Sequence, residues 1–303
     1  MRHVLPLLLA PFAIAAAVPV PFIVDGRGYR SLDAALAAIG DRTATVVIAP
    51  GVYRECAVQT AGVVTFRAAR PGTVVFEREA CEDKAGLVLR GRGSVVDGIV
   101  FRGYRVNDGN GAGIRSERGD LTVVNAMFLD SQQGIGGGYP GRQRITIDHT
   151  SFAGLGQCDE SESCAHAIYL ITPGSVSVTH SRFERGRGGH YVKIRSPEVH
   201  VDGNSFDDTA GRGTNYMIDL ANGGTGTITG NAFVQGAHKE NGSTLIAVAA
   251  ETRQYPTAGL RIDGNTASLA PGAGRTAFVS DWAHQPLAIG SNRLSGMMPL
   301  VRK

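Results

Sequence analysis

Hydrophobic and polar positions alternate in three similar phrases between Ala165 and Gly224. Two apolar residues flank one polar residue in each phrase, and alternation with period two predicts a β-strand with one buried face. The apolar pairs are Ile168 and Leu170, Val192 and Ile194, and Ile218 and Leu220. The residues between them are Tyr169, Lys193 and Asp219, which we expect to point outward. If the strands stack in parallel, these three side chains form one row at a spacing of about 4.8 Å.

A second phrase, an alternating apolar strand ending in a large residue, recurs along most of the chain. Its last residues are Phe101, Phe128, Phe152, Phe183, Phe206 and Phe233, with Ala267 and Leu294 in the same place of two weaker copies. Consecutive phenylalanines lie 23 to 31 residues apart, a repeat length typical of a solenoid whose coils bury their inner faces against each other. With 41 glycines and short β-branched strands, the pattern predicts an all-β fold, a right-handed parallel β-helix of three strands per coil.

The chain begins with a short basic start, an apolar run from Val4 to Ile14 and three alanines. This pattern is typical of a cleaved secretory signal over residues 1–17 and is too short to span a bilayer, although a buried core helix is the alternative. We therefore expect a periplasmic or secreted protein, with one domain over residues 18–303. No later segment approaches the about 20 apolar residues that a membrane span needs.

A single helix is predicted over residues 31–39. Ser31 can cap it, Leu32, Leu36 and Ile39 share one side, and Gly40 ends it. A helix in this place would cover the open apolar end of the first coil.

The four cysteines are expected to form two disulfides, which an exported protein permits. Cys56 and Cys81 lie 25 residues apart, about one coil, and Cys158 and Cys164 enclose the acidic segment CDESESC. We predict the pairs Cys56 with Cys81 and Cys158 with Cys164. Zinc binding is the alternative, but the chain has no Cys-x-x-Cys pair.

The N-terminal phrase resembles the opening of the pectate-lyase-like parallel β-helix superfamily. There, a helix and strand followed by a turn such as Pro50-Gly51-Val52-Tyr53 lead into the first coil. Together with the coils, the resemblance covers nearly all of the chain after the signal. It implies the fold and leaves the function open, because the superfamily includes lyases, hydrolases, esterases, epimerases and non-catalytic binders.

The outward row offers groups suited to proton transfer. Lys193 is one of only 4 lysines beside 26 arginines, and an amine, unlike a guanidinium, can lose its proton in a suitable site. Arg195 lies on the same face and suits a carboxylate. These groups point to β-elimination on a uronic-acid polymer: Arg195 neutralises the sugar carboxylate, Lys193 removes the C5 proton, and Tyr169 or His190 protonates the leaving oxygen. We expect substrate contacts from Tyr191, which the same alternation places outward, and from Asp219, His166 and Tyr216.

The arrangement is similar to that of β-helical lyases of the chondroitinase-B and alginate-lyase type. This resemblance allows calcium as a cofactor, although the Asn and Glu ligands of that group have no clear counterpart here, so we expect no cofactor. The motifs of polygalacturonases and of β-helical epimerases are absent from the sequence.

Other interpretations remain open for the same residues. Lys193 could form a structural ion pair with Asp219, and His166 and His190 could stack on each other at the strand entrance, since they share the parity of the buried residues. A non-catalytic glycan-binding or cell-envelope protein is the alternative function. A glycoside hydrolase would need a second carboxylate beside Asp219, and the sequence shows Asp219 alone.

A net charge of +3 gives no reason to expect nucleic acid as a partner. An acidic polysaccharide is compatible with this charge. We expect a monomer.

Overall fold

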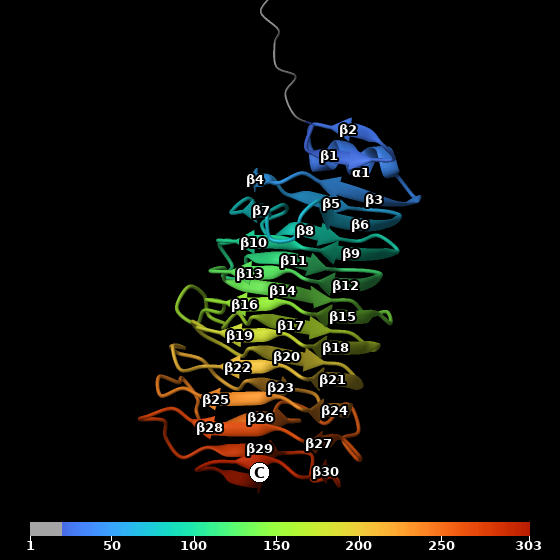
Figure 1. Cartoon of the computed structure of the whole chain (residues 1–303). Coiled ribbons are helices and arrows are strands. Elements are labelled where there is room, and N and C mark those ends of the chain that lie inside the picture. Colours follow the sequence, from blue (N-terminus) through green and yellow to red (C-terminus); the bar gives the residue numbers. More distant parts are fainter. Residues whose placement is uncertain (1–19) are drawn as a thin grey trace, which may run out of the picture.

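Residues 20–303 of the computed structural model wind into a solenoid of stacked coils, closed at one end by a small cap (Figure 1). The predicted signal, residues 1–17, lies outside the described residues. The strands of residues 20–303 form three sheets, which we call A, B and C, and each full coil contributes one strand to each sheet. From β3 onward the strands pair in parallel from coil to coil, whereas β1 pairs antiparallel with both β2 and β3. The predicted right-handed parallel β-helix with three strands per coil is confirmed.

Sheet A has 12 strands and sheets B and C have 10 each. In spatial order, sheet A consists of β2 (Arg27–Tyr29), β1 (Phe22–Val24), β3 (Thr43–Ile48), β6 (Val63–Ala68), β9 (Gly93–Asp97), β12 (Asp120–Val124), β15 (Arg144–Asp148), β18 (Ser175–Thr179), β21 (Glu198–Asp202), β24 (Thr225–Thr229), β27 (Arg261–Asp263) and β30 (Ala288–Ile289). Sheet B consists of β4 (Gly51–Tyr53), β7 (Val74–Glu77), β10 (Ile99–Arg102), β13 (Met127–Leu129), β16 (Ser151–Ala153), β19 (Arg182–Glu184), β22 (Ser205–Asp207), β25 (Ala232–Gln235), β28 (Thr266–Leu269) and β31 (Arg293–Leu294). Sheet C consists of β5 (Ala57–Gln59), β8 (Ala85–Leu89), β11 (Ala112–Ser116), β14 (Gln133–Gly138), β17 (Ile168–Ile171), β20 (Val192–Arg195), β23 (Ile218–Leu220), β26 (Thr244–Val248), β29 (Ala277–Asp281) and β32 (Met298–Arg302).

The cap contains the predicted helix, α1 (Leu32–Ile39), and the antiparallel strands β1 and β2. The Ser31 hydroxyl accepts a hydrogen bond from the Ala34 N–H, and Gly40 ends the helix with a φ of 58°. Leu32 and Ile39 are buried in the same core cluster as the coils. The helix therefore covers the open end of the solenoid, as predicted.

The repeated phenylalanines form a continuous stack inside the solenoid. Phe101, Phe128, Phe152, Phe183, Phe206 and Phe233 stack with ring centroids 4.7 to 5.1 Å apart. Ala267 and Leu294 continue the same row in β28 and β31. The phrase that defined the repeat in the sequence thus marks one register position in sheet B.

An asparagine ladder links the turns after successive strands of sheet A. Asn231 is buried, its Nδ2 donates to the Val201 carbonyl at 2.7 Å, and its Oδ1 accepts from the Asn204 backbone N–H at 2.9 Å. Asn265 and Asn292 repeat these contacts in the next coils. The ladder satisfies backbone groups that a turn would otherwise bury unpaired.

We expect Asn231→Ala to lower the free energy of unfolding by about 2–3 kcal/mol, because a backbone donor and acceptor lose their partners. Urea denaturation measures the change. Asn292→Ala is the matched control, since the same residue type there sits partly exposed in the last coil, where water can replace the lost bonds. Equal losses in the two variants would show that burial does not set the value of the ladder.

Both predicted disulfides are present, joining Cys56 to Cys81 and Cys158 to Cys164. The first links neighbouring coils, just ahead of β5 and β8. The second closes the acidic segment two residues before His166. This loop therefore has a fixed base beside sheet C.

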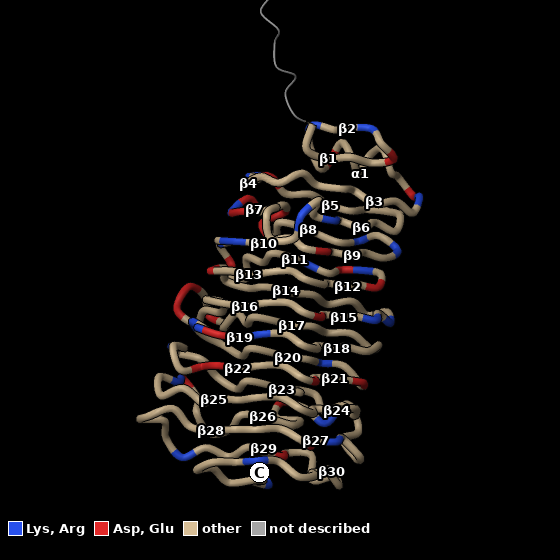
Figure 2. The backbone as a smooth tube through the Cα atoms, in the orientation of Figure 1, with Lys and Arg blue, Asp and Glu red and all other residues tan. Residues whose placement is uncertain are grey.

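Charged residues lie mainly on the turns and at the ends of strands (Figure 2). Within residues 20–303, no helix has the length and apolar character needed to cross a bilayer. Lys193 and Asp219, inside strands of sheet C, depart from this pattern.

Candidate functional site

The predicted outward row exists on sheet C. Tyr169 in β17 pairs with Lys193 in β20, and Lys193 pairs with Asp219 in β23. The apolar residues that flank the row are all buried in the core, namely Ile168, Leu170, Val192, Ile194, Ile218 and Leu220. The row is shielded more than expected, since Lys193 is 9% and Asp219 2% exposed.

Lys193 and Arg195 hold a carboxylate between them. Lys193 Nζ donates to Glu251 Oε1 at 2.6 Å, and Arg195 Nη2 donates to Glu251 Oε2. Glu251 comes from the turn after β26, and its side chain is 40% exposed. We call these two cations the carboxylate cradle. Partial burial acts to raise the pKa of Glu251, but the hydrogen bonds from Lys193 and Arg195 outweigh it and lower the pKa. The cradle therefore holds a carboxylate ion.

Arg195 also orders the phenol of Tyr169. Its Nε donates to the Tyr169 hydroxyl at 3.0 Å, and its Nη1 donates to Asn222. The phenol oxygen is the acceptor in this bond, so its own proton is free for another acceptor. Lys193 Nζ lies 5.4 Å from the Tyr169 ring centroid, which adds a cation–π contact.

Asp219 is a buried carboxyl group beneath the cradle. Its Oδ2 lies 3.7 Å from Lys193 Nζ and 3.4 Å from His190 Nε2. Within residues 20–303 its Oδ1 has no hydrogen-bond partner. Burial raises the pKa of Asp219 to about 6, against the opposing effect of Lys193. The sequence suggested that Asp219 has no second carboxylate beside it. The structure corrects this, because Lys193 contacts both Asp219 and Glu251.

The raised pKa of Asp219 makes stability depend on pH. The native state binds this proton more tightly than the unfolded state, so the contribution is fully present below about pH 4 and is lost as the pH rises through about 6. We expect Asp219→Asn, which cannot ionise, to gain up to about 3 kcal/mol over wild type between pH 4 and pH 8. Urea denaturation of both proteins across this range measures the difference. A difference that does not change with pH would contradict the raised pKa.

His166 and His190 stack at the entrance of their strands, one of the two arrangements the sequence left open. Their ring centroids lie 4.8 Å apart, and His190 stacks in turn on Tyr216. Nδ1 of His166 accepts from the His190 backbone N–H, and Nδ1 of His190 accepts from the Tyr216 backbone N–H. This network assigns the proton of each neutral ring to Nε2. Burial lowers the pKa of His166 to about 3 and that of His190 well below its usual value, so both rings are neutral donors.

The prediction that Tyr191 points outward is wrong. Tyr191 is 2% exposed, its ring lies 6.1 Å from that of Phe183, and its hydroxyl donates to buried Asp208 at 2.7 Å. Strand β20 begins only at Val192, and Gly189 has a φ of 59°, so the alternation does not extend back to Tyr191. A side chain in this position cannot contact a substrate on sheet C.

Tyr216 is half-buried beside the site and does not line the hollow next to Lys193. Its ring stacks on His190, and its hydroxyl accepts from Asn241 Nδ2 at 3.0 Å. We therefore assign Tyr216 to the support of His190.

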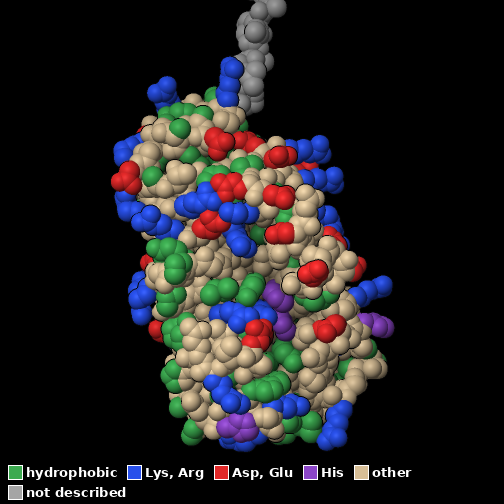
Figure 3. Space-filling model, turned by 180° about the vertical axis from the view of Figure 1, so that it is seen from behind, with side chains coloured by type: hydrophobic (Ala, Val, Ile, Leu, Met, Phe, Trp, Pro, Cys, Tyr) green, Lys and Arg blue, Asp and Glu red, His purple; other side chains and the backbone are tan. Residues whose placement is uncertain are grey.

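Two hollows on the outer face of sheet C meet at Arg195. The first, of about 390 Å³, is lined by His166, Tyr169, His190 and Lys193 together with the loop around Cys164. The second, of about 410 Å³, is lined by apolar and aromatic residues that include Tyr139, Ile171 and Tyr255. On the face shown in Figure 3, histidine side chains adjoin basic and acidic ones about half-way along the solenoid. Arg195 therefore stands between the two hollows and lines both of them.

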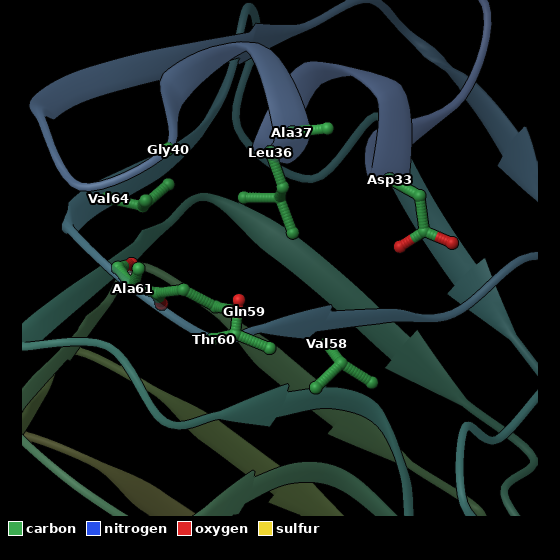
Figure 4. A pocket seen from close by; sticks show the side chains of 9 residues that line it. All are labelled: Asp33, Leu36, Ala37, Gly40, Val58, Gln59, Thr60, Ala61 and Val64. Atoms are coloured by element: carbon green, nitrogen blue, oxygen red, sulfur yellow. The ribbon is translucent and has the colours of Figure 1, made fainter.

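A separate cleft lies between α1 and β5 (Figure 4). Its lining includes Leu36, Val58, Gln59 and Val64, and Asp33 is its one titratable residue. It lacks paired groups for acid–base chemistry, so it is not the candidate active site.

Sequence reasoning missed Glu251 and Asn222. Both follow strands of sheet C, in the turns after β26 and β23, and both contact Arg195. The three-phrase repeat continues for one more coil at Leu245–Val248, in the strand that pairs with β23. Extending the repeat to this strand would have placed Glu251 just after its C-terminal end, on the side where Arg195 lies.

The cradle does not suit calcium. Calcium requires six to eight oxygen ligands, whereas both nearby carboxylates, Asp219 and Glu251, already lie against Lys193. A calcium ion would be a third cation beside Lys193 and Arg195, and their charges would repel it.

No protein-family model matches the sequence, and no curated protein matches it. Among solved structures, the chain is similar to the A-module of a mannuronan C-5 epimerase from Azotobacter vinelandii, with 14% identity, 89% of this chain and 91% of that one covered, and a TM-score of 0.46. It is also similar to a pectin methylesterase from Aspergillus niger, with 11% identity, 90% and 84% coverage and a TM-score of 0.49. A pectate lyase shows 14% identity, 91% and 74% coverage and a TM-score of 0.47. At such identities a similarity concerns the coil architecture, and activity depends on the residues of each site.

Proposed function

We propose that this protein is a polysaccharide lyase that cleaves a uronic-acid-containing glycan by β-elimination on the outer face of sheet C. One observation carries the proposal: Lys193 and Arg195 already hold a carboxylate, that of Glu251, at the edge of an open hollow. A sugar carboxylate has the same charge and geometry, and Glu251 is a partly exposed turn residue that can give way to it. Arg195 suits this task because its planar fork matches a carboxylate.

The reaction needs the C5 proton of the uronate to become acidic. Arg195 would neutralise the sugar carboxylate. His166 and His190 line the same hollow, and their Nε2–H groups would donate further hydrogen bonds to it. The bond between C5 and its proton then breaks, the electron pair forms the C4–C5 double bond, and the C4–O4 bond breaks with release of the leaving sugar.

Lys193 and Tyr169 are the groups assigned to proton transfer. Once the sugar carboxylate displaces Glu251, the Lys193 ammonium releases one proton to water, and the neutral amine then takes the proton from C5. Tyr169 donates to O4, since its oxygen accepts from Arg195 and leaves its proton available. His190 is less suited to this acid role than the sequence suggested, because burial keeps its ring neutral.

A glycoside hydrolase is the second candidate, favoured by the pair Asp219 and Glu251 on either side of Lys193. Paired carboxyl groups, one with a raised pKa, are the usual parts of such a site. Asp219, however, is only 2% exposed and lies beneath Lys193. This burial separates it from a glycosidic oxygen and favours elimination.

We propose that the protein works in the periplasm or outside the cell. Its two disulfides support this, because such bonds form and persist in oxidising compartments. The expected partner is an acidic polysaccharide.

Ultraviolet absorbance on a panel of uronate polymers tests the proposal, because β-elimination creates an unsaturated product. We expect absorbance to rise with wild type on at least one polymer and not with Lys193→Ala. New reducing ends without absorbance would indicate hydrolysis. Binding without either signal, unchanged in Lys193→Ala, would indicate a non-catalytic glycan-binding protein.

Glu251→Gln should strengthen the binding of uronate oligosaccharides. The substitution removes the anion that competes for Lys193 and Arg195 and keeps the size of the side chain, so we expect Kd to fall by about 5- to 30-fold, equivalent to one charge-assisted contact of about 1–2 kcal/mol. Isothermal titration calorimetry measures this. Asp263→Asn, which removes an ion pair with Arg261 on sheet A, is the matched control. Weaker binding in Glu251→Gln would mean that Glu251 itself contacts the sugar.

A further inference from the structure

Two histidines occupy strained turn positions on the side of the solenoid where sheet A leads into sheet B. From β9 to β27, the first residue after each strand of sheet A has a left-handed backbone with positive φ. This residue is glycine after β9, β21, β24 and β27 (Gly98, Gly203, Gly230 and Gly264). After β15 and β18 the same position holds His149 and His180, with φ of 47° and 46°. A left-handed backbone is unfavourable for a residue with a Cβ, so two successive histidines here call for a reason.

The two imidazoles converge on one carboxylate. Asp148 Oδ2 lies 2.7 Å from His149 Nδ1, and Asp148 Oδ1 lies 2.8 Å from His180 Nδ1. The rings stack at a centroid distance of 5.0 Å. The hydroxyl of Thr179 donates to Asp148 Oδ1 at 2.6 Å and orients it.

We propose that Asp148, His149 and His180 bind one divalent transition-metal ion of the Zn²⁺ type. One ligand atom from each residue lies within 4.8 Å of the others. Two imidazole nitrogens and one carboxylate oxygen form a donor set that Zn²⁺ accepts, with about 2.0–2.2 Å to each atom and an open position for water. The nitrogen–oxygen separations need to open by about half an ångström for tetrahedral geometry, and both histidines are more than half exposed and can move.

The bound ion would cross-link two neighbouring coils, because His149 follows β15 and His180 follows β18. The site is separate from the carboxylate cradle, which lies on sheet C. Within residues 20–303, no other group of three His, Cys, Asp or Glu side chains brings its ligand atoms this close together. Cys56, Cys81, Cys158 and Cys164 are all in disulfides, and Nδ1 of both His166 and His190 already accepts a backbone bond.

Calorimetric titration of ZnCl₂ into the metal-stripped full chain tests the site. We expect wild type to take up one Zn²⁺ here and to melt at a higher temperature with the ion bound. His149→Gly and His180→Gly should each weaken Zn²⁺ binding at least about 10-fold. Even the loss of a residue that only orients a metal ligand has an effect of this size. The glycine variants should keep the melting temperature of metal-free wild type or exceed it, because four other coils use glycine at this left-handed position.

His200→Asn is the matched control, since His200 is a partly exposed histidine on sheet A that bonds Thr227 and Glu198. It should bind Zn²⁺ as wild type does. Visible absorption of the Co²⁺-loaded protein gives a second readout of imidazole ligation. The proposal is overturned if wild type takes up no Zn²⁺, or if the double glycine variant retains the stoichiometry and affinity of wild type.

Discussion

Lys193→Arg is expected to lower kcat of β-elimination by about 10²- to 10⁴-fold while changing KM by less than about tenfold. Arginine keeps the positive charge beside Glu251 and Asp219, so the site can still bind a carboxylate. A guanidinium does not release a proton near neutral pH, so the variant cannot accept the proton from C5. Initial rates of ultraviolet absorbance increase on the cleaved polymer measure the change.

Lys84→Arg is the matched control for this substitution. Lys84 also contacts two carboxylates, those of Glu82 and Glu117, but lies in the turn just before β8, away from the cradle. The Lys84→Arg variant should cleave the polymer at the same rate as wild type. If Lys193→Arg retains most of the activity, Lys193 acts only as a charge and another group removes the proton.

The largest loss of stability is expected from Asp208→Asn, at about 3–5 kcal/mol in the free energy of unfolding. Asp208 is 0% exposed and accepts from the Tyr191 hydroxyl at 2.7 Å and the Thr214 hydroxyl at 2.8 Å. It also pairs with the buried ammonium of Lys239 at 3.0 Å. An amide would leave that ammonium buried without a counter-charge. The same network supports the segment before His190, because Thr214 pairs with Gly189.

Urea denaturation of Asp208→Asn, Lys239→Met and the double variant separates the charge from the hydrogen bonds. The double variant should recover more than half of the loss, because no unpaired ammonium remains. A loss below about 1 kcal/mol in Asp208→Asn would show that the ion pair is not needed to hold the turn.

The fold and the row on sheet C were predictable from the sequence because both rest on strict periodicity. Inside a strand, alternation fixes which side chains face the core, so Lys193 and Asp219 could be placed outward. Across coils, the phenylalanine repeat fixed the register. The disulfides were predictable because Cys56 and Cys81 lie one coil apart.

The contacts that complete the site depend on turns, where neither rule holds. Tyr191 turned inward because a left-handed glycine resets the alternation before β20. Glu251 reached Arg195 from a turn whose path its sequence does not fix. The burial of Asp219 likewise comes from neighbouring turns and side chains, so its raised pKa could not be read from the strand pattern.

The crystal structure of Tyr169→Phe with a bound uronate oligosaccharide tests the carboxylate cradle most directly. This variant keeps Lys193 and Arg195 but lacks the proposed acid, so the substrate should remain uncleaved. We predict a sugar carboxylate within hydrogen-bond distance of Arg195, with the Glu251 side chain displaced from both cations. An oligosaccharide bound elsewhere, or bound with Glu251 still held between Lys193 and Arg195, would contradict the proposed role of the cradle.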